Sequence, residues 1–468
     1  MSYRKGIVMK MMFSRRDLMR IMIPLVIQQV LAVTIGMADS MMVSAAGEAA
    51  VSGVSLVNSL DILLICIFSA LAAGGSIVVS QFLGKKDTEL ACSSAKQLIY
   101  TTTAVATFIS LVVIVFRFPL LDALFGDVEA DVMRHAQSYF LYVALSFPFL
   151  AMYDAGAALF RAMGNSMVSM STSLVMNVLN LIGNAILIFG FGMGAAGAAI
   201  ATLFSRIVGA FVIIVLLHKK DNVVHVERIF HFRPDFSVIK RILRIGVPSG
   251  VENSMFQFGK LLTQTLISSM GTASIAANAV AHTLATFQYM PGNAIGLATV
   301  TVVGRCIGAQ EKEQATKYSR LIVGLTYLFL WLVILLTVLL AKPVIGIYAL
   351  SAEASEMAYS LIIYHAICAA IIWPISFTLP GSFRAASDVK FPLIVSVVSM
   401  WLLRVALSYV LAPVSTVIFG VTVPGLGWGV MGVWVAMTAD WLFRAVFFLY
   451  RHFSGKWLTK YRAHEKTA

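Results

Sequence analysis

The sequence predicts an all-α polytopic membrane protein, with about 12 transmembrane helices in two six-helix lobes related by a pseudo-twofold axis. Three observations lead to this prediction: the apolar composition, the division of the chain into apolar blocks, and an internal repeat. Of the 468 residues, 59% are hydrophobic and 12% are charged, against about 25% charged in an average soluble protein. Polar residues cannot cover so much apolar surface, so a soluble enzyme is excluded and the bilayer is the expected solvent.

Each apolar block is long enough to cross a bilayer as a helix, which needs about 20 mostly apolar residues. The blocks lack the alternation that a membrane barrel requires, and backbone in hydrocarbon must satisfy its own hydrogen bonds, so we expect helices and no strands. Short polar or glycine-rich breaks separate the blocks. The predicted spans are 18–43, 52–82, 93–118, 132–160, 167–189, 195–218, 239–269, 275–304, 315–341, 357–379, 391–412 and 427–450.

Lys and Arg are distributed unevenly between the two ends of these spans. Of 35 such residues, 28 fall on one side: in the N-terminal segment, the central loop, the C-terminal tail, and after the second, fourth, eighth and tenth spans. The other side carries Arg117, Arg134 and Lys342 beside the acids Asp122 and Asp127. The positive-inside rule therefore predicts a multi-pass protein of the cytoplasmic (plasma) membrane with both termini cytoplasmic. Topology explains the net charge of +13 without a nucleic-acid partner.

The two halves of the chain repeat each other. A shift of 224 residues places Pro24 on Pro248, and a shift of 223 places Arg161 on Arg384; after an insertion around 413–425 the shift becomes 235. Six helices per repeat is an even number, so both halves enter from the same side, and a site between them can face either side by rocking, as in transporters. The predicted units are an N-terminal lobe, a connecting loop, a C-terminal lobe and a basic tail, at 1–220, 221–238, 239–450 and 451–468.

Charged side chains inside spans are costly, at about 2.5–3.5 kcal/mol each on insertion scales, so each invites a functional hypothesis. Asp440 and Arg444 are four residues apart on one helix and are expected to neutralise each other. Asp154 lies near a basic helix end, which favours a structural or gating role. The intramembrane acids are Asp39, Asp61, Asp154, Glu252 and Asp440, and the bases are Arg206, Lys260, Arg404 and Arg444.

Asp39 is distinct because its own span has no basic residue within two turns. Such a carboxylate can exchange a proton near neutral pH or bind a small cation such as Na⁺, although it can also simply bond the backbone and Ser40. In the fifth span Asn177, Asn180 and Asn184 share one helical stripe. Amides in this position can ligate a cation or join helices by hydrogen bonds, and the spacing is compatible with both interpretations.

Glu252 is the repeat equivalent of Gln28, and Lys260 lies two turns further along the same helix face. Glu252 has two possible roles: it binds substrate or an ion, or it forms a structural pair with Lys260, Arg404 or another neighbour. Helical rise separates Glu252 from Lys260 by about 12 Å, so direct pairing between these two would need long side chains that bend toward each other. Methionine and aromatic side chains suit an adaptable cleft, although most such residues face lipid or packed helices. The candidates are Met37, Met152, Met255, Phe256, Phe287 and Tyr289.

No motif of a membrane enzyme is present. The sequence has no GxxxxGK[ST] phosphate loop and no HExxH, GxSxG or EF-hand pattern, and its four cysteines are scattered without the spacing of a zinc site. We therefore expect neither an enzyme nor a bound cofactor.

Several segments resemble those of the multidrug and toxic compound extrusion (MATE) transporters. They are GMADSMMVSAAG in the first span, SQFLGKKD after the second, FRAMGNS after the fourth, NVLNLIGNAILIFG followed by GAAGAAIAT, and GVPSG in the seventh. The resemblance covers nearly the whole chain. It implies two lobes around a central cleft and a monomer in membrane lipid. The implied activity is alternating-access export of small-molecule organic cations or amphipathic compounds in exchange for H⁺ or Na⁺.

By this resemblance, the N-lobe cation site comprises Asp39, Asn180, Asn184 and Thr202, with Asn184 at a position where many members have Asp. The chain departs from the sodium-coupled members at two points: Phe256 stands where they have a seventh-span Glu, and 357–379 contains no acid. The resemblance therefore places coupling at Asp39 and leaves Gln28, Met37, Glu252, Met255, Phe256 and Tyr289 as candidates for a substrate or ion cleft. A flippase for a lipid-linked precursor is the alternative function, and the small number of intramembrane bases argues against it.

Overall fold

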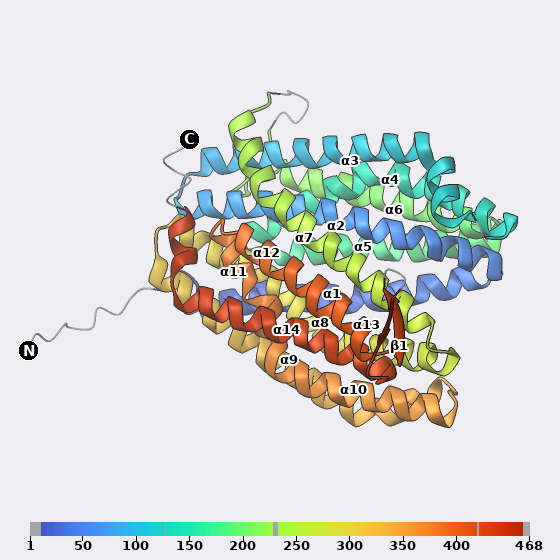
Figure 1. Cartoon of the computed structure of the whole chain (residues 1–468). Helices are drawn as coiled ribbons and strands as arrows, with labels where there is room; N and C mark the ends of the chain where they lie inside the picture. The colour runs from blue at the N-terminus through green and yellow to red at the C-terminus, as the bar shows by residue number, and fades with distance from the viewer. Residues whose placement is uncertain (1–10, 127, 228–232, 419–420, 462–468) are drawn as a thin grey trace, which may run out of the picture.

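The computed structural model describes residues 11–126, 128–227, 233–418 and 421–461 (Figure 1). Parts of the predicted connecting loop and basic tail, at 228–232 and 462–468, lie outside the described residues, as do the basic residues of 1–10. The first half contains α1 (Arg15–Ser44), α2 (Glu48–Gly84), α3 (Thr88–Phe125), α4 (Ala130–Ala162), α5 (Ser166–Asn184), the π-helical turn η1 (Ala185–Gly190) and α6 (Gly194–Leu217).

The second half begins with α7 (Phe236–Ser268), α8 (Thr272–Gly308) and α9 (Lys312–Ile347). Its remaining spans are interrupted by π-helical turns: α10 (Ala352–Trp373), η2 (Pro374–Thr378) and α11 (Pro380–Ala385), then α12 (Lys390–Ser399), η3 (Met400–Ala406) and α13 (Leu407–Leu411). The chain continues with α14 (Gly429–Phe453) and the 3-10 turn η4 (Lys456–Thr459). Every one of the twelve predicted spans is therefore helical, and the all-α fold class is confirmed.

The expectation of no strands misses one small element. The segments β1 (Ser415–Ile418) and β2 (Val421–Pro424) pair antiparallel, with Ser415 opposite Pro424. They occupy the insertion around 413–425, which has no counterpart in the first half. The insertion is too short to span a bilayer. The hydropathy pattern, which identifies spanning helices, therefore gives no indication of the two short strands.

Helix boundaries repeat between the two halves. Both α2 and α8 start after a glycine with positive φ, Gly47 at 99° and Gly271 at 90°, which glycine adopts at little cost. Both helices are 37 residues long, and each is followed by a left-handed residue, Lys86 or Gln310, with φ of 62°. The sequence repeat is thus a repeat of backbone conformation.

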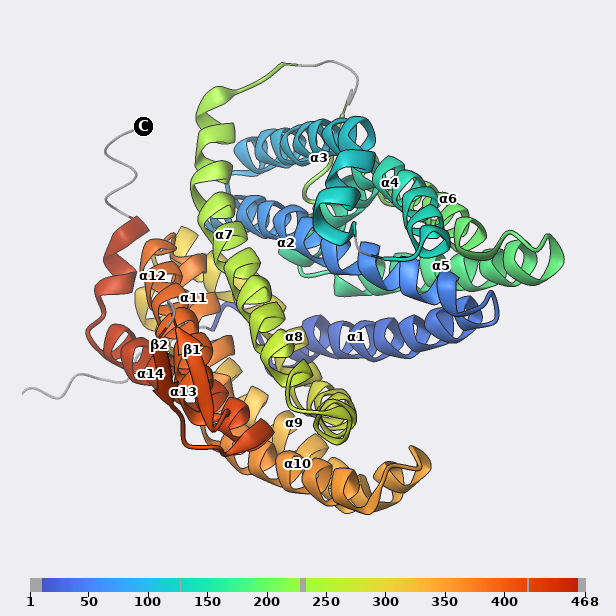
Figure 2. The same cartoon turned by 45° about the vertical axis from the view of Figure 1, so that its right-hand side comes forward.

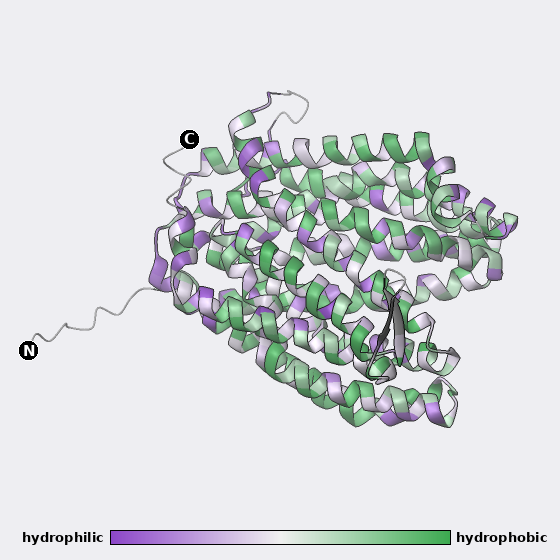
Figure 3. Cartoon of the chain, viewed as in Figure 1, coloured by the Kyte–Doolittle hydropathy of each residue, from purple (hydrophilic) through white to green (hydrophobic). Residues whose placement is uncertain are grey.

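Apolar side chains cover the outside of the helices. Within the described residues, ten helical stretches are long and apolar enough to cross a membrane, and α7 and α8 are the two long helices outside this set. Hydrophobic residues follow the lengths of the helices and hydrophilic ones gather toward their ends (Figure 3). Phe108 on α3 and Leu339 on α9 are among the large apolar side chains exposed. Lipid is the expected partner of this surface, as in an integral membrane protein.

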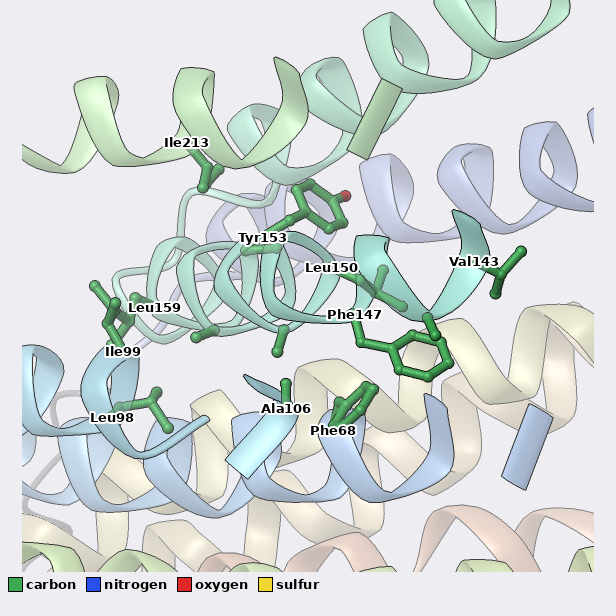
Figure 4. Packing of buried hydrophobic residues seen from close by; sticks show 14 of the residues in the cluster. Phe68, Leu98, Ile99, Ala106, Val143, Phe147, Leu150, Tyr153, Leu159 and Ile213 are labelled. Carbon is green, nitrogen blue, oxygen red and sulfur yellow. The ribbon is translucent and has the colours of Figure 1, made fainter. Parts of the chain in front are cut away.

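The helices form two lobes, which we call the N-lobe (α1–α6) and the C-lobe (α7–α14) (Figure 2). The core of the N-lobe, which residues of α7 also join, includes Phe68 of α2 packed on Phe147 of α4 with ring centroids 5.6 Å apart (Figure 4). Separate apolar clusters hold the C-lobe together, and one of them includes Phe13 and Leu18 at the start of the chain. Figures 1 and 2 show the lobes adjoining beside α2 and α7 and separating toward the far ends of α1 and α10.

The lobes contact each other closely at the C-terminal ends of α2 and α8. A Cβ added to Gly84 would overlap the carbonyl oxygen of Arg305, and one added to Gly308 would overlap that of Gln81. The Gln81 amide also donates to the carbonyl of Ala385 at 2.8 Å and accepts from Arg241 at 2.9 Å. This closed end is the one where the sequence places most of the basic residues.

Candidate functional site

Four of the predicted site residues meet within the N-lobe. Asn184 Nδ2, on α5, donates a hydrogen bond to Asp39 Oδ1, on α1. Asn180 Nδ2 donates to Thr202 Oγ1, on α6, at 3.1 Å, and Asn184 also reaches Asn180 Oδ1 at 3.5 Å. Three helices therefore contribute one connected group, which we call the Asp39 cluster: Asp39, Asn180, Asn184 and Thr202.

The local packing fixes the amides of α5. Gly183 lies against α6, where an added Cβ would come within 2.8 Å of the Ala201 Cβ. The π-helical turn η1 begins directly after Asn184, and such turns often occur at functional sites. Asn177, the third amide of the predicted stripe, does not join the network in the described part of the chain. Ser40 donates to the carbonyl of Gly36 at 3.0 Å, so its hydroxyl serves the helix backbone.

The cluster offers oxygen atoms to a small cation. Asn184 is buried, and its Oδ1 makes no hydrogen bond in the described structure. Together with the Asp39 carboxylate and Thr202 Oγ1, this gives a set of hard oxygen donors of the type that alkali and alkaline-earth cations prefer. Within the described residues there is no group of three or more His, Cys, Asp or Glu that could hold a metal ion. The cluster itself contains a single carboxylate, that of Asp39.

Two other N-lobe acids lie beside arginine. The buried Asp61, on α2, pairs with Arg206 of α6, with 3.6 Å between Oδ2 and Nη2. Arg206 also donates to Ser146 Oγ at 2.7 Å. Asp154, on α4, interacts electrostatically with Arg161 and Arg206. Asp61 thus differs from Asp39, which accepts a hydrogen bond from the amide of Asn184.

Glu252, on α7, has an arginine partner. Its Oε1 accepts hydrogen bonds from Arg384 Nη2 at 2.7 Å and from Ser396 Oγ at 2.8 Å. Neither Lys260 nor Arg404 is the partner. This geometry corresponds to the structural alternative for Glu252, with an arginine that its sequence spacing did not single out.

The N-lobe contains the equivalent arrangement. Gln28 Oε1 accepts from Ser169 Oγ at 3.2 Å, and that serine accepts from Arg161 Nη1 at 3.1 Å. Arg161 and Arg384 are repeat equivalents, as are Gln28 and Glu252. In both lobes an arginine at the end of the fourth span is therefore linked to the first span, directly in the C-lobe and through Ser169 in the N-lobe.

A cavity of about 380 Å³ lies mainly in the C-lobe, between α7, α8, α10, η2, η3 and α14, and Cys66 of α2 also lines it. Of the predicted cleft residues, Phe256 and Tyr289 line it, and Gln28, Met37, Glu252 and Met255 are not among its lining residues. Lys260 and Arg404, predicted only as intramembrane charges, also line it. The sequence analysis did not single out the other aromatic side chains of its wall, which come from α10, η2 and α14: His365, Trp373, Phe377, Trp434 and Trp441.

Two lobes of repeated helices with polar sites inside the membrane region define a membrane transporter. The MatE family model matches residues 24–186 and 248–410, and the chain belongs to this family. It is therefore a transporter and not an enzyme. The second match starts 224 residues after the first, which is the offset of the internal repeat. The match to this family does not favour the flippase alternative.

Two bacterial proteins that align over nearly their whole length are among the similar relatives. The "Uncharacterized transporter YisQ" of Bacillus subtilis is 28% identical over 93% of this chain and 94% of that protein. The "Probable multidrug resistance protein NorM" of Thermotoga maritima is 26% identical over 96% of each chain. Among solved structures, a MATE protein in the straight conformation has a TM-score of 0.85 at 20% identity, covering 95% of this chain and 97% of that one.

Proposed function

We propose that the protein is a secondary active antiporter that exports amphipathic, often cationic, compounds in exchange for H⁺ or Na⁺ by alternating access. The observation that carries the proposal is the Asp39 cluster, in which a carboxylate has an amide donor beside oxygen ligands. The similarity to proteins named as multidrug resistance proteins supports an organic compound as the substrate.

The Asn184–Asp39 hydrogen bond suggests how an ion acts on the lobe. A proton on the carboxylate, or a Na⁺ ion at its oxygens, competes with the Asn184 amide for the same atom. Loss of that bond loosens α1 from α5 within the N-lobe. Binding of the ion from outside then favours release of the compound, and return to the inward-facing state releases the ion into the cytoplasm.

The same proposal places the protein in the cytoplasmic membrane with both termini inside. The two lobes, 1–220 and 239–450, rock about the contact between α2 and α8, and the closed end near Gly84 and Gly308 faces the cytoplasm. The described conformation is then outward-facing. Exchange of one H⁺ for a monovalent cation moves no net charge, so a pH difference alone drives about tenfold accumulation per pH unit.

The test is efflux from proteoliposomes that contain purified full-length protein. We would load ethidium or 2-naphthoate and impose either a pH gradient or a Na⁺ gradient. The proposal predicts that one gradient drives efflux of at least one probe and that Asp39→Asn abolishes this. Asp131→Asn, an exposed acid that pairs with Arg134 on α4, should behave as wild type. Wild-type transport by Asp39→Asn, or no gradient-driven efflux of either probe, would overturn the proposal.

A further inference from the structure

The charged groups that line the C-lobe cavity are positive. Lys260 of α7 and Arg404 of η3 line it, whereas none of the described residues that line it is an Asp or a Glu. Glu252, the nearest acid on α7 in sequence, is engaged by Arg384. In the described structure no ion pair is present at Lys260, whose ammonium lies 6.0 Å from the centre of the Phe256 ring.

Arg404 is only partly neutralised. Its side chain is 9% exposed, and its Nη1 makes no hydrogen bond in the described residues. The nearest carboxylate is that of the fully buried Asp440, 3.7 Å away, and this acid already accepts a hydrogen bond from Arg444 at 2.7 Å. One carboxylate thus serves two arginines, and Lys260 adds a third positive charge. Buried charge without a partner is unfavourable, so an anion in the cavity would be stabilised.

The internal repeat relates this cavity to the Asp39 cluster. The offset of 223 to 224 residues carries Asp39 to Thr263 or the residue before it and Asn180 to Leu403 or Arg404, and both Thr263 and Arg404 line the cavity. The fifth span of each lobe also contains a π-helical turn, η1 directly after Asn184 and η3 around Arg404. The corresponding regions of the two lobes therefore differ in charge: the Asp39 cluster contains an acid, and the C-lobe cavity contains the bases Lys260 and Arg404.

The walls of the cavity are flat aromatic rings. Trp373 stacks on Tyr289 with centroids 5.9 Å apart and an interplanar angle of 9°, and on Phe377 at 5.1 Å and 21°. Phe256 lies 5.2 Å from the Arg404 guanidinium. Pockets of about 300–1,000 Å³ with apolar walls and a few convergent polar groups are typical of small-molecule sites. This cavity falls within that range.

We propose that the C-lobe cavity binds an amphipathic organic anion, with a planar aromatic body between the rings and its anionic group between Lys260 and Arg404. The inference rests on the proposed function and deepens it by naming a substrate class. It differs from the cationic compounds that the family resemblance implies. Inward movement of H⁺ in exchange for outward movement of a monovalent anion transfers two positive charges inward, so an inside-negative membrane potential drives anion export.

The experiment measures binding directly, without any gradient. Full-length protein in lipid nanodiscs is titrated calorimetrically with 2-naphthoate and with 2-naphthylmethylammonium, which share a ring system and differ in charge. The expected result is at least tenfold tighter binding of 2-naphthoate. Equal or tighter binding of the cation would overturn the inference.

Variants locate the site. Lys260→Gln should weaken 2-naphthoate binding at least tenfold, Lys260→Arg should retain it, and Lys260→Glu should shift the preference to the cation. Lys317→Gln, at an exposed lysine that pairs with Glu313 on α9, is the control and should bind as wild type. Unchanged binding in Lys260→Gln would overturn the inference. Gel-filtration profiles and the Lys260→Arg result distinguish lost binding from lost folding.

The two proposals fail separately. If ethidium efflux depends on a gradient and on Asp39 but 2-naphthoate does not bind, the antiporter proposal stands and the anion site is wrong. If 2-naphthoate binds through Lys260 but no gradient moves either probe, the anion site stands and the antiporter proposal is wrong.

Discussion

Asn184 of α5 donates a hydrogen bond to the Asp39 carboxylate of α1, joining residues 145 positions apart. A hydrogen bond to a charged group contributes about 1.5–3 kcal/mol, and about 1.4 kcal/mol is a factor of ten. We predict that Asn184→Ala slows gradient-driven efflux about tenfold or more. Thr202→Val should have a smaller effect, because Thr202 contacts the cluster through Asn180. Initial efflux rates at matched protein levels measure both.

Asn177 provides the matched control for that experiment. It lies on the same helix two turns before Asn184, outside the hydrogen-bonded cluster. Asn177→Ala should transport at the wild-type rate. If Asn184→Ala also did so, the hydrogen bond to Asp39 would have no part in coupling.

The Glu252–Arg384 pair predicts a loss of stability without loss of coupling. Removing one partner of a buried ion pair costs about 3–5 kcal/mol, and the lower end applies because the Arg384 side chain is 24% exposed. Glu252→Gln should lower the thermal unfolding temperature of the purified protein, and the Glu252→Gln/Arg384→Gln double variant should recover part of it. Efflux per folded molecule should still follow the ion gradient. A stable but uncoupled Glu252→Gln protein would instead make Glu252 an ion site.

Because α2 and α8 contact each other so closely, we predict that one methyl group added at Gly308 opens the closed end. In Gly308→Ala the new Cβ overlaps the Gln81 carbonyl oxygen, and overpacking of this kind costs about 1–3 kcal/mol. Cys306, fully buried beside it, should then react faster with N-ethylmaleimide in a background that lacks the other three cysteines. Gly324→Ala, where an added Cβ meets nothing within 4 Å, should leave the reaction unchanged. Equal labelling of the two variants would contradict a tight closure at Gly308.

The distribution of basic residues predicts the orientation of the chain. Green fluorescent protein fused after residue 468 should fluoresce in bacterial cells, and alkaline phosphatase fused there should be inactive. The same phosphatase fused after Gly126, between α3 and α4, should be active. The reverse pattern would place the closed end outside and the described conformation inward-facing.

Spans and repeat were predictable because they depend on local signals. Runs of apolar residues define helices that cross a bilayer. The repeat is recognised because matching residues, such as Pro24 and Pro248, are separated by a nearly constant number of positions. The Asp39 cluster was predictable from its resemblance to a family, and the spacing of Asn180 and Asn184 already placed them on one helix face.

The remaining features depend on how distant helices pack. Glu252 finds Arg384 across 132 residues, a pairing that no helical spacing indicates. Trp373 and Trp441 reach one cavity from different helices, and hydropathy does not distinguish a ring that faces a cavity from one that faces lipid. Lys260 and Arg404 were visible as intramembrane charges, but only the structure places both at one cavity.

Coupling through the Asp39 cluster is best tested by measuring both fluxes in the same proteoliposomes. An internal pH dye or ²²Na⁺ records ion uptake while the fluorescence of the exported probe records efflux. The account predicts that uptake of one ion accompanies efflux in a fixed ratio in wild type and that both stop in Asp39→Asn. Efflux without ion uptake, or coupled fluxes that persist in Asp39→Asn, would contradict it.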